Sequence, residues 1–416
     1  MRVLVVDVNF DYKNPMYRQF YTSLMGCMEV DFFGPGYVSR ACLEKGIGQY
    51  LSENGKYDAI LVGTYFVYSS GEKGLRFDAY KVHRHTIPFY RVNDAWQCCG
   101  KILEELKKIE GIVKLFIYYE DFMSLPVGDK SICQKLIDCG FYILSWPIEY
   151  MKEYSARLMH QYSYLTNNAY KLASEYTANY VPIPLHGIGY HEIFIRNFSD
   201  RDYDWCIPGN RAKIYYPERA VVHETLEEKR KKIWDDDPFQ TLSVDTIRRE
   251  HMEWYHFRNK QEKILSWLWG KDKYIPSHPK MNYIAACREQ YLESMRASKL
   301  VYADCGAGMC FVRKYFEAGA CGAVLVAKKV PGMKEMGFIH DVNCIIVEKY
   351  DDIINIDKKY TMQELEVIAK NGQKFIMEKH MLVHRAEALS RTIKSIMDGN
   401  YIGAFWEDGN YMIKQR

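Results

Sequence analysis

One stretch of the chain, Ser298–Val347, has the sequence SKLVYADCGAGMCFVRKYFEAGACGAVLVAKKVPGMKEMGFIHDVNCIIV. It begins with an apolar run that is typical of a buried strand and continues through a glycine-containing loop into a helical pattern at Val312–Cys321. A turn of small residues then leads to a second apolar run, Ala323–Val326. A strand, a helix and another strand in this order predict a βαβ unit with parallel strands.

The same alternation extends outward from this stretch. Strand and helix patterns alternate from Arg2 to Ser145, and a second series begins at Asp204. Between them, Tyr180–Phe194 contains two prolines and two glycines, which is typical of a linker. We therefore predict an α/β protein with two doubly wound, Rossmann-like domains that face a cleft. The predicted units are residues 1–180, residues 181–397 and an aromatic tail, residues 398–416, that packs back on the first domain.

Composition and apolar patterning argue against several other classes of protein, although the charge balance does not rule out nucleic acid as a partner. The 416 residues include 56 Lys and Arg against 53 Asp and Glu, which is not the basic excess typical of a protein that grips a polyanion. The longest apolar stretch, Ala59–Tyr68, has about half of the ~20 residues that a membrane-spanning helix needs. Asp7 interrupts the apolar run near the N-terminus, unlike a signal peptide. We expect a cytoplasmic protein without a transmembrane segment, its cysteines reduced.

Metal and dinucleotide motifs are incomplete. His83 with His85, and Cys305 with Cys310, do not supply the four convergent ligands of structural zinc, so we predict no metal site. Gly34-Pro35-Gly36 lacks the third glycine of the dinucleotide fingerprint and follows the second strand rather than the first.

The loop and helix of the opening stretch suggest an anion site. Arg313 and Glu317 are four residues apart and therefore share one helix face. The amides of Gly306 and Gly308 and the start of the helix can hold phosphate, and a carboxylate one turn further can accept two vicinal hydroxyls. Together these groups suit a nucleoside diphosphate with its ribose. An i,i+4 pair of this kind is, however, more often a surface salt bridge.

These residues resemble the donor half of glycosyltransferases with the GT-B fold, closest to the group 1 and CgeB-like (spore-maturation-type) proteins. The resemblance rests on Arg313–Gly322 (RKYFEAGACG) and on the loop with Gly337-Phe338 and Asn343. It extends over roughly residues 180–397, and the first half matches only in architecture. Further matching positions are Asp204–Ile207, Gly209-Asn210, Tyr216–Arg219, His380 and Arg385-Ala386.

The resemblance implies a hexosyl or related transferase that binds a nucleotide-sugar in its second domain and an acceptor in its first. It implies no metal and no cofactor beyond the donor substrate. Glu317 would bind the donor ribose, and groups near Gly209 and Arg313 would hold the diphosphate. The full set of expected donor-binding residues is Gly209, Asn210, Arg219, Gly306, Gly308, Arg313, Lys314 and Glu317.

The catalytic base should follow a strand of the first domain. Asp11 follows the first strand, and Glu120 and Asp121 follow the strand at Ile112–Tyr119, with Asp121 as the first choice.

Two departures from the family pattern leave alternatives open. Met309 stands where many retaining members carry a second glutamate, so the stereochemistry is open. Phe239–Pro279 is a Trp- and Tyr-rich insertion, either a helical hairpin or a surface for an acceptor or partner. A surface glycan or lipid-linked saccharide is the expected acceptor. The alternatives are a modified base in DNA, which is less favoured, and a catalytically silent binding or assembly protein.

Overall fold

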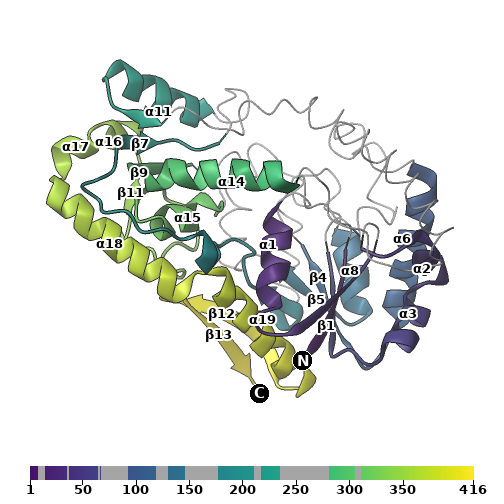
Figure 1. Ribbon diagram of the computed structural model, residues 1–416. Coiled ribbons are helices and arrows are strands. Elements are labelled where there is room, and N and C mark those ends of the chain that lie inside the picture. The colour runs from purple at the N-terminus through teal and green to yellow at the C-terminus, as the bar shows by residue number, and fades with distance from the viewer. Residues whose placement is uncertain are drawn as a thin grey trace.

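The computed structural model describes residues 1–7, 15–34, 37–63, 66, 92–118, 130–145, 177–209, 217–234, 281–304 and 311–416. In this part of the chain, two parallel sheets lie side by side, each covered by helices (Figure 1). The structure confirms the predicted α/β class.

The first sheet has six strands in the order β2-β1-β3-β4-β5-β6. Every neighbouring pair is parallel, and the residues of β1 and β3 are almost all fully buried, as in sheets covered on both faces. The strands are β1 (Arg2–Val6), β2 (Glu29–Phe33), β3 (Ala59–Val62), β4 (Val113–Ile117), β5 (Phe141–Ser145) and β6 (Tyr180–Pro182). The helices between them are α1 (Pro15–Leu24), α2 (Arg40–Lys45), α3 (Ile47–Asn54), α6 (Val92–Lys108) and α8 (Lys130–Asp138).

The second sheet has five strands in the order β11-β10-β9-β7-β8, again all parallel. The strands are β7 (Tyr203–Cys206), β8 (Ile233–Trp234), β9 (Ser298–Ala303), β10 (Val324–Lys328) and β11 (Ile345–Val347). The helices are α11 (Pro217–Glu228), α14 (Met281–Arg296), α15 (Lys314–Ala320), α16 (Tyr350–Ile354), α17 (Ile356–Lys359), α18 (Met362–Lys379) and α19 (Leu382–Met397).

Both sheets share one topology. In each, the first strand in sequence lies between the second and the third, so that β1 lies between β2 and β3 and β7 lies between β8 and β9. The direction in which the chain adds strands reverses there. In doubly wound sheets, ligands bind outside the carboxyl ends of the strands at this switch point. The topology therefore identifies two places for a ligand, one beside β1 and β3 and one beside β7 and β9.

Three details differ from the sequence prediction. The pattern of Ala41–Ser52 predicts one helix, but the structure has α2 and α3 there, because the Glu105 carboxylate accepts hydrogen bonds from the amides of Ile47 and Gly48 and a new helix begins at Ile47. The pattern that begins at Pro217 predicts a helix to about Asp235, but α11 ends at Glu228, and β8 follows. The first sheet also extends slightly past the predicted boundary at residue 180, because β6 pairs with β5 through Pro182.

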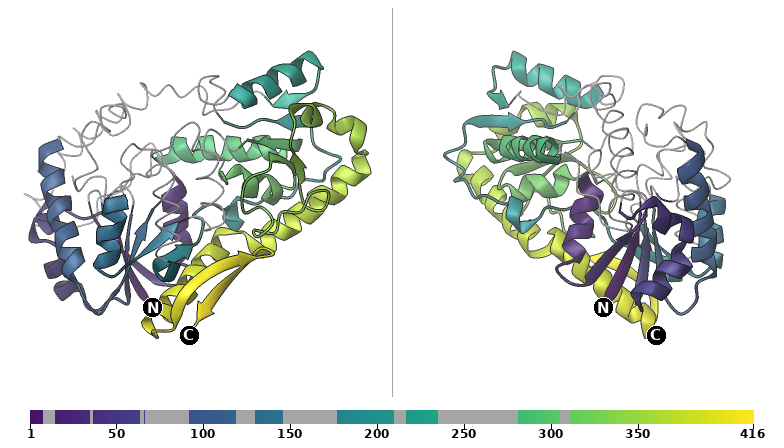
Figure 2. Two further views of the ribbon diagram at one scale, coloured as in Figure 1. Left: turned by 180° about the vertical axis from the view of Figure 1, so that it is seen from behind. Right: turned by 45° about the vertical axis from the view of Figure 1, so that its right-hand side comes forward.

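The C-terminal tail forms an antiparallel hairpin of β12 (Tyr401–Glu407) and β13 (Asn410–Gln415). Asp408 and Gly409 join the strands with positive φ, the geometry of the tight turn that Asp-Gly favours. The hairpin lies against α19 and β6 (Figure 2). The indole Nε1 of Trp406 donates to the carbonyl of Pro182 at 2.6 Å, which ties the tail to the last strand of the first sheet.

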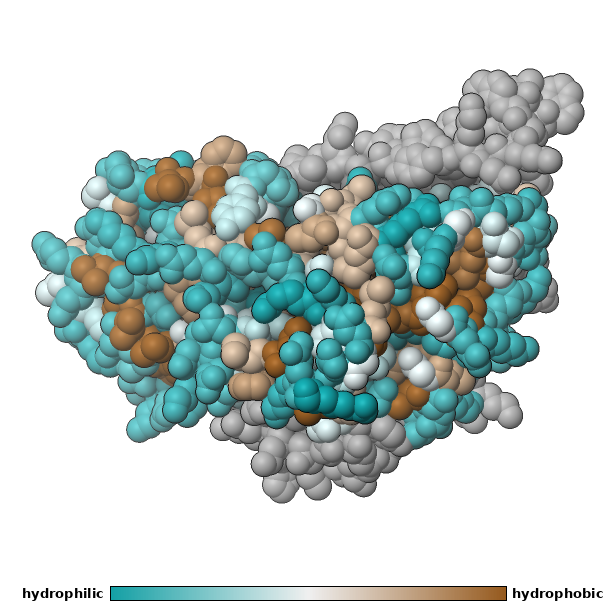
Figure 3. Space-filling model, turned by 90° about the horizontal axis from the view of Figure 1, so that it is seen from below, coloured by the Kyte–Doolittle hydropathy of each residue, from teal (hydrophilic) through white to brown (hydrophobic). Residues whose placement is uncertain are grey.

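The lower face of the molecule, seen in Figure 3, is mainly hydrophilic, with hydrophobic residues in several groups. In the described part of the chain, no helix is both long enough and apolar enough to span a membrane.

Candidate functional site

Four residues of the second half converge at the switch point between β7 and β9. Asp304 directly follows β9, and Gly209 lies three residues after β7. Arg219 of α11 donates from Nε at 3.0 Å and from Nη2 at 2.5 Å to one Asp304 carboxylate oxygen. Lys314, the first residue of α15, places its Nζ 3.8 Å from the same oxygen. Two cations are thus held by one carboxylate at the edge where ligands of such sheets bind.

Gly209 is required by this arrangement. Its φ of +97° is a conformation that residues with a side chain rarely adopt. A Cβ atom here would lie 2.9 Å from Nη1 of Arg219 and 3.1 Å from Nζ of Lys314. The backbone at Gly209 therefore approaches both cationic groups directly, and any larger residue would displace them.

Glu317, one turn into α15, is the centre of a second group. Its carboxylate is fully buried, 2.6 Å from Nη1 of Arg288 and 3.0 Å from Nε of Arg313. The hydroxyl of Tyr291 donates to its other oxygen at 2.9 Å. The predicted Arg313–Glu317 pair therefore exists, but it belongs to a buried network rather than to the surface.

This network continues to the first half of the chain. Arg288 also donates from Nε to Glu192 at 3.0 Å, and Glu192 lies in the segment that joins the two sheets. Gln19 of α1 donates from Nε2 to the same Glu192 oxygen at 3.0 Å and accepts a hydrogen bond from Nη2 of Arg313. Two buried carboxylates and two guanidinium groups thus alternate from α1 to α15.

Burial and neighbouring charges shift the pKa values of three groups in this network. Burial alone would raise the pKa of Glu192, but the Arg288 guanidinium, the Gly189 amide and the charge of Arg313 together outweigh it, and the pKa of Glu192 is lowered. Burial and the adjacent Arg288 both lower the pKa of Arg313. Burial, followed by the charge of Glu317, raises the pKa of Tyr291 well above its usual value, so this hydroxyl remains a hydrogen-bond donor.

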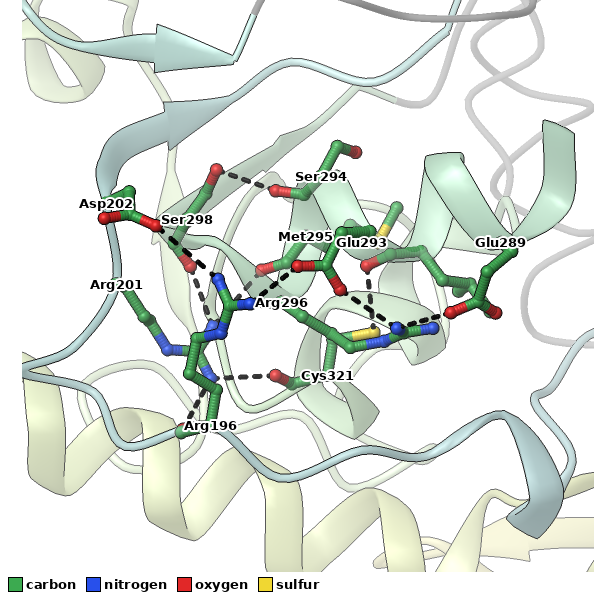
Figure 4. Close-up of polar contacts among 11 residues, drawn as sticks. Arg196, Arg201, Asp202, Glu289, Glu293, Ser294, Met295, Arg296, Ser298 and Cys321 are labelled. Carbon is green, nitrogen blue, oxygen red and sulfur yellow. Dashed lines mark hydrogen bonds and ion pairs between the residues drawn. The ribbon is translucent and has the colours of Figure 1, made fainter. Parts of the chain in front are cut away.

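A separate arginine cluster lies at the amino ends of the strands of the second sheet, where β7, β9 and β10 begin (Figure 4). Arg201 is buried and donates to the carbonyls of Ser298 and Cys321, both at 2.8 Å. Arg296 pairs with Glu289 at 2.7 Å and Glu293 at 3.0 Å. Because these partners are backbone carbonyls and neighbouring carboxylates at the amino ends of the strands, we interpret the cluster as structural.

The described candidate residues thus fall into two groups. Gly209, Arg219 and Lys314 meet around Asp304, and Arg313 and Glu317 meet around Arg288. The remaining candidates lie outside the described residues, and their roles stay predictions: Asn210, Gly306 and Gly308 for the donor, and Asp11, Glu120 and Asp121 for the base. The predicted insertion at Phe239–Pro279 lies there as well.

Sequence reasoning missed six residues of these groups and of the first switch point. Asp304 and Asp7 carried a signal, because each is a charged residue at the end of an apolar run. Asp7 is buried after β1, where it accepts hydrogen bonds from the Tyr21 hydroxyl at 2.6 Å and the Phe66 amide at 3.1 Å. The other members of the network around Arg313 and Glu317 carried no signal in the sequence: Gln19, Glu192, Arg288 and Tyr291.

Other positions of the family pattern have structural partners. His380 is fully buried, accepts from Arg385 at Nδ1 and contacts the Met336 carbonyl at Nε2, both at 2.7 Å. The guanidinium of Arg385 lies over the Trp406 ring, 4.8 Å from its centroid. Asn343 bridges its own loop by bonding the Ile339 amide at 2.8 Å and the Gly337 carbonyl at 2.9 Å.

Part of the chain matches a known family model, and nearly the whole chain is similar in fold to solved structures. Residues 263–391 match a family model described as "Glycosyl transferase-like". The chain is similar to sucrose-phosphate synthase from Thermosynechococcus elongatus, with a TM-score of 0.52 and 11% identity over 96% of this chain and 100% of that one. It is also similar to HepE from Anabaena in complex with UDP, with a TM-score of 0.50 and 12% identity over 95% of this chain and 100% of that one.

A comparison with curated proteins found no match. At these identities the structural similarity shows the fold alone, and that fold is GT-B.

Proposed function

We propose that this protein is a glycosyltransferase that moves a hexosyl or related sugar from a nucleoside-diphosphate donor to a hydroxyl group. The convergence of Arg219 and Lys314 on Asp304 beside Gly209 carries the proposal, because it lies where doubly wound sheets bind ligands. The match to a glycosyltransferase-like family model over residues 263–391, which include Asp304 and Lys314, supports it. The finer assignment to the group 1 and CgeB-like proteins is part of the same proposal.

The chemistry of the two cations suits a diphosphate. The Arg219 guanidinium can present two parallel N–H groups to a phosphate, and the Lys314 ammonium acts as a compact positive charge. As the bond from the sugar to the diphosphate breaks, negative charge grows on the leaving group, and fixed cations there stabilise the transition state. Asp304 orients both side chains without entering the reaction. We propose that this mechanism needs no metal ion.

The other substrate contacts remain proposals. Glu317 would bind the ribose, which requires a hydroxyl to share its carboxylate with Arg288, Arg313 and Tyr291. A saccharide or lipid-linked acceptor would bind on the side of the first sheet, with its base among Asp11, Glu120 and Asp121. The UDP in the HepE structure makes UDP-sugars the first donors to test.

The test uses a panel of nucleotide-sugars, each measured for thermal stabilisation of the protein and for slow release of free sugar in EDTA. We expect one donor class to do both. Lys314→Met should abolish both effects, whereas Lys299→Met, a lysine near the other end of β9 that pairs with Asp204 at 3.7 Å, should keep them. Stabilisation without sugar release would favour the silent binding protein. No response to any nucleotide-sugar would overturn the proposal.

A further inference from the structure

Gln19 connects the first sheet with an arginine of the candidate donor site. It lies on α1, which in Figures 1 and 2 lies between the strands of the first sheet and the helices α14 and α15. Its side chain is half-buried and contacts two residues far away in sequence. Nε2 donates to Glu192 at 3.0 Å, and Oε1 accepts from Nη2 of Arg313.

The orientation of this amide follows from the chemistry of its neighbours. A guanidinium can only donate hydrogen bonds, and an ionised carboxylate can only accept them. The lowered pKa of Glu192 keeps its carboxylate ionised. The amide oxygen must therefore face Arg313 and the amide nitrogen must face Glu192. No other uncharged side chain of this length supplies one acceptor and one donor in this way.

Gln19 and Glu317 hold Arg313 from two sides. The guanidinium has five N–H groups. Its Nε lies 3.0 Å from Glu317, and one N–H of Nη2 points to Gln19. Among the described residues, Nη1 has no hydrogen-bond partner, and the side chain as a whole is 18% exposed. The edge formed by Nη1 and the second N–H of Nη2 can therefore bind a phosphate with two parallel bonds.

We propose that Gln19 is a positioning residue for the donor: it fixes the plane of the Arg313 guanidinium so that this edge faces the diphosphate. This inference rests on the proposed function. It adds that the first half of the chain takes part in donor binding, through α1, in addition to binding the acceptor. A donor bound at Arg313 would in turn stabilise the contacts of Gln19 with Glu192 and Arg313, because donor binding and these contacts are thermodynamically linked.

The test compares Gln19→Met, which has the same length but no polar atoms, with Gln19→Asn, whose amide is too short to reach both partners. Gln49→Met is the matched control, because Gln49 lies exposed on α3 and its side chain donates to the neighbouring Glu53 at 2.7 Å. Calorimetry should show UDP affinity reduced about fivefold to tenfold in both Gln19 variants and unchanged in the control. Uridine, titrated by NMR, should bind all four proteins equally, because it lacks the phosphates.

A double-mutant cycle separates positioning from general damage. Arg313→Met should weaken UDP binding more than Gln19→Met, and the double variant should bind UDP no worse than Arg313→Met alone. Additive losses, equal losses for UDP and uridine, or normal UDP binding by Gln19→Met would each overturn the inference. Normal UDP binding by Arg313→Met would also overturn it while leaving the proposed function intact. A wild-type protein that binds no nucleoside diphosphate would instead refute the proposed function.

Discussion

Replacing Glu317 by glutamine removes one negative charge from between two guanidinium groups. The side chain is fully buried, so water cannot replace the lost charge. Arg288 at 2.6 Å and Arg313 at 3.0 Å would then face each other across an uncharged amide. With the glutamine oxygen toward the two arginines, its NH2 group would lie against the Tyr291 hydroxyl, which would have to accept a hydrogen bond instead of donating one.

The expected loss of stability follows from these contacts. Breaking a buried ion pair by removing one partner costs about 3–5 kcal/mol. The variant keeps one acceptor oxygen, and Glu192 still pairs with Arg288 at 3.0 Å, so we expect the lower end, about 3 kcal/mol. If the second sheet and its helices unfold as one unit of about 150–250 residues, the melting temperature should fall by about 6–12 °C.

Differential scanning calorimetry at neutral pH measures this loss. Glu293→Gln is the control, because Glu293 also contacts two arginines, Arg196 at 2.8 Å and Arg296 at 3.0 Å, but its side chain is 33% exposed. The control should lose less than about 1 kcal/mol. A Glu317→Gln variant as stable as the wild type, or a control that loses as much, would show that burial of the Glu317 network has been misjudged.

Three further predictions concern other parts of the molecule. If Glu317 binds ribose, the wild type should prefer UDP to 2′-deoxy-UDP in calorimetry and Glu317→Gln should lose the preference; equal preference in both proteins would remove Glu317 from ribose binding. Deleting residues 398–416 exposes the apolar surface that Tyr401, Trp406 and Tyr411 cover, whose burial contributes several kcal/mol to stability at ~25 cal/mol per Å². The melting temperature should therefore fall clearly, and an unchanged value would contradict this packing. Burial, followed by nearby arginines, lowers the pKa of His186 and His380 well below 6.5. The unfolded state therefore binds more protons, and the free energy of unfolding should fall as the pH drops below about 6.5, by up to about 4 kcal/mol from pH 7 to 5. Urea titrations measure this loss, and a free energy of unfolding that does not change with pH would refute the prediction.

The sequence was sufficient to predict the fold because strand and helix patterns are local. The apolar runs of the sequence predict strands at Glu29–Phe33 and Phe141–Ser145, and β2 and β5 have these bounds. The pairing of Arg313 with Glu317 was predictable for the same reason, since helix geometry brings positions four apart together. The hairpin of the tail was missed although Asp408-Gly409 between aromatic runs is a strong turn signal.

The partners of the site residues were not predictable, because they depend on how distant segments pack. Arg219 and Asp304 are 85 residues apart, and Gln19 and Arg313 are 294 apart. Glutamine on a helix and arginine in an amphipathic helix are ordinary in a sequence, so neither Gln19 nor Arg288 is distinguished before the two sheets are assembled. Asp304 is the exception, since a carboxylate directly after a buried parallel strand indicates the ligand-binding edge.

The central claim is that the cations between β7 and β9 hold a nucleoside diphosphate, and calorimetric titration of UDP into wild type and Lys314→Met tests it most directly. Arg219 still pairs with Asp304 in this variant, at 2.5 Å, so the fold and the melting temperature should be retained. We predict that the wild type binds UDP and that Lys314→Met binds it at least about tenfold more weakly, the loss of one charge-assisted contact. Equal UDP affinity in the two proteins at equal stability would contradict the claim.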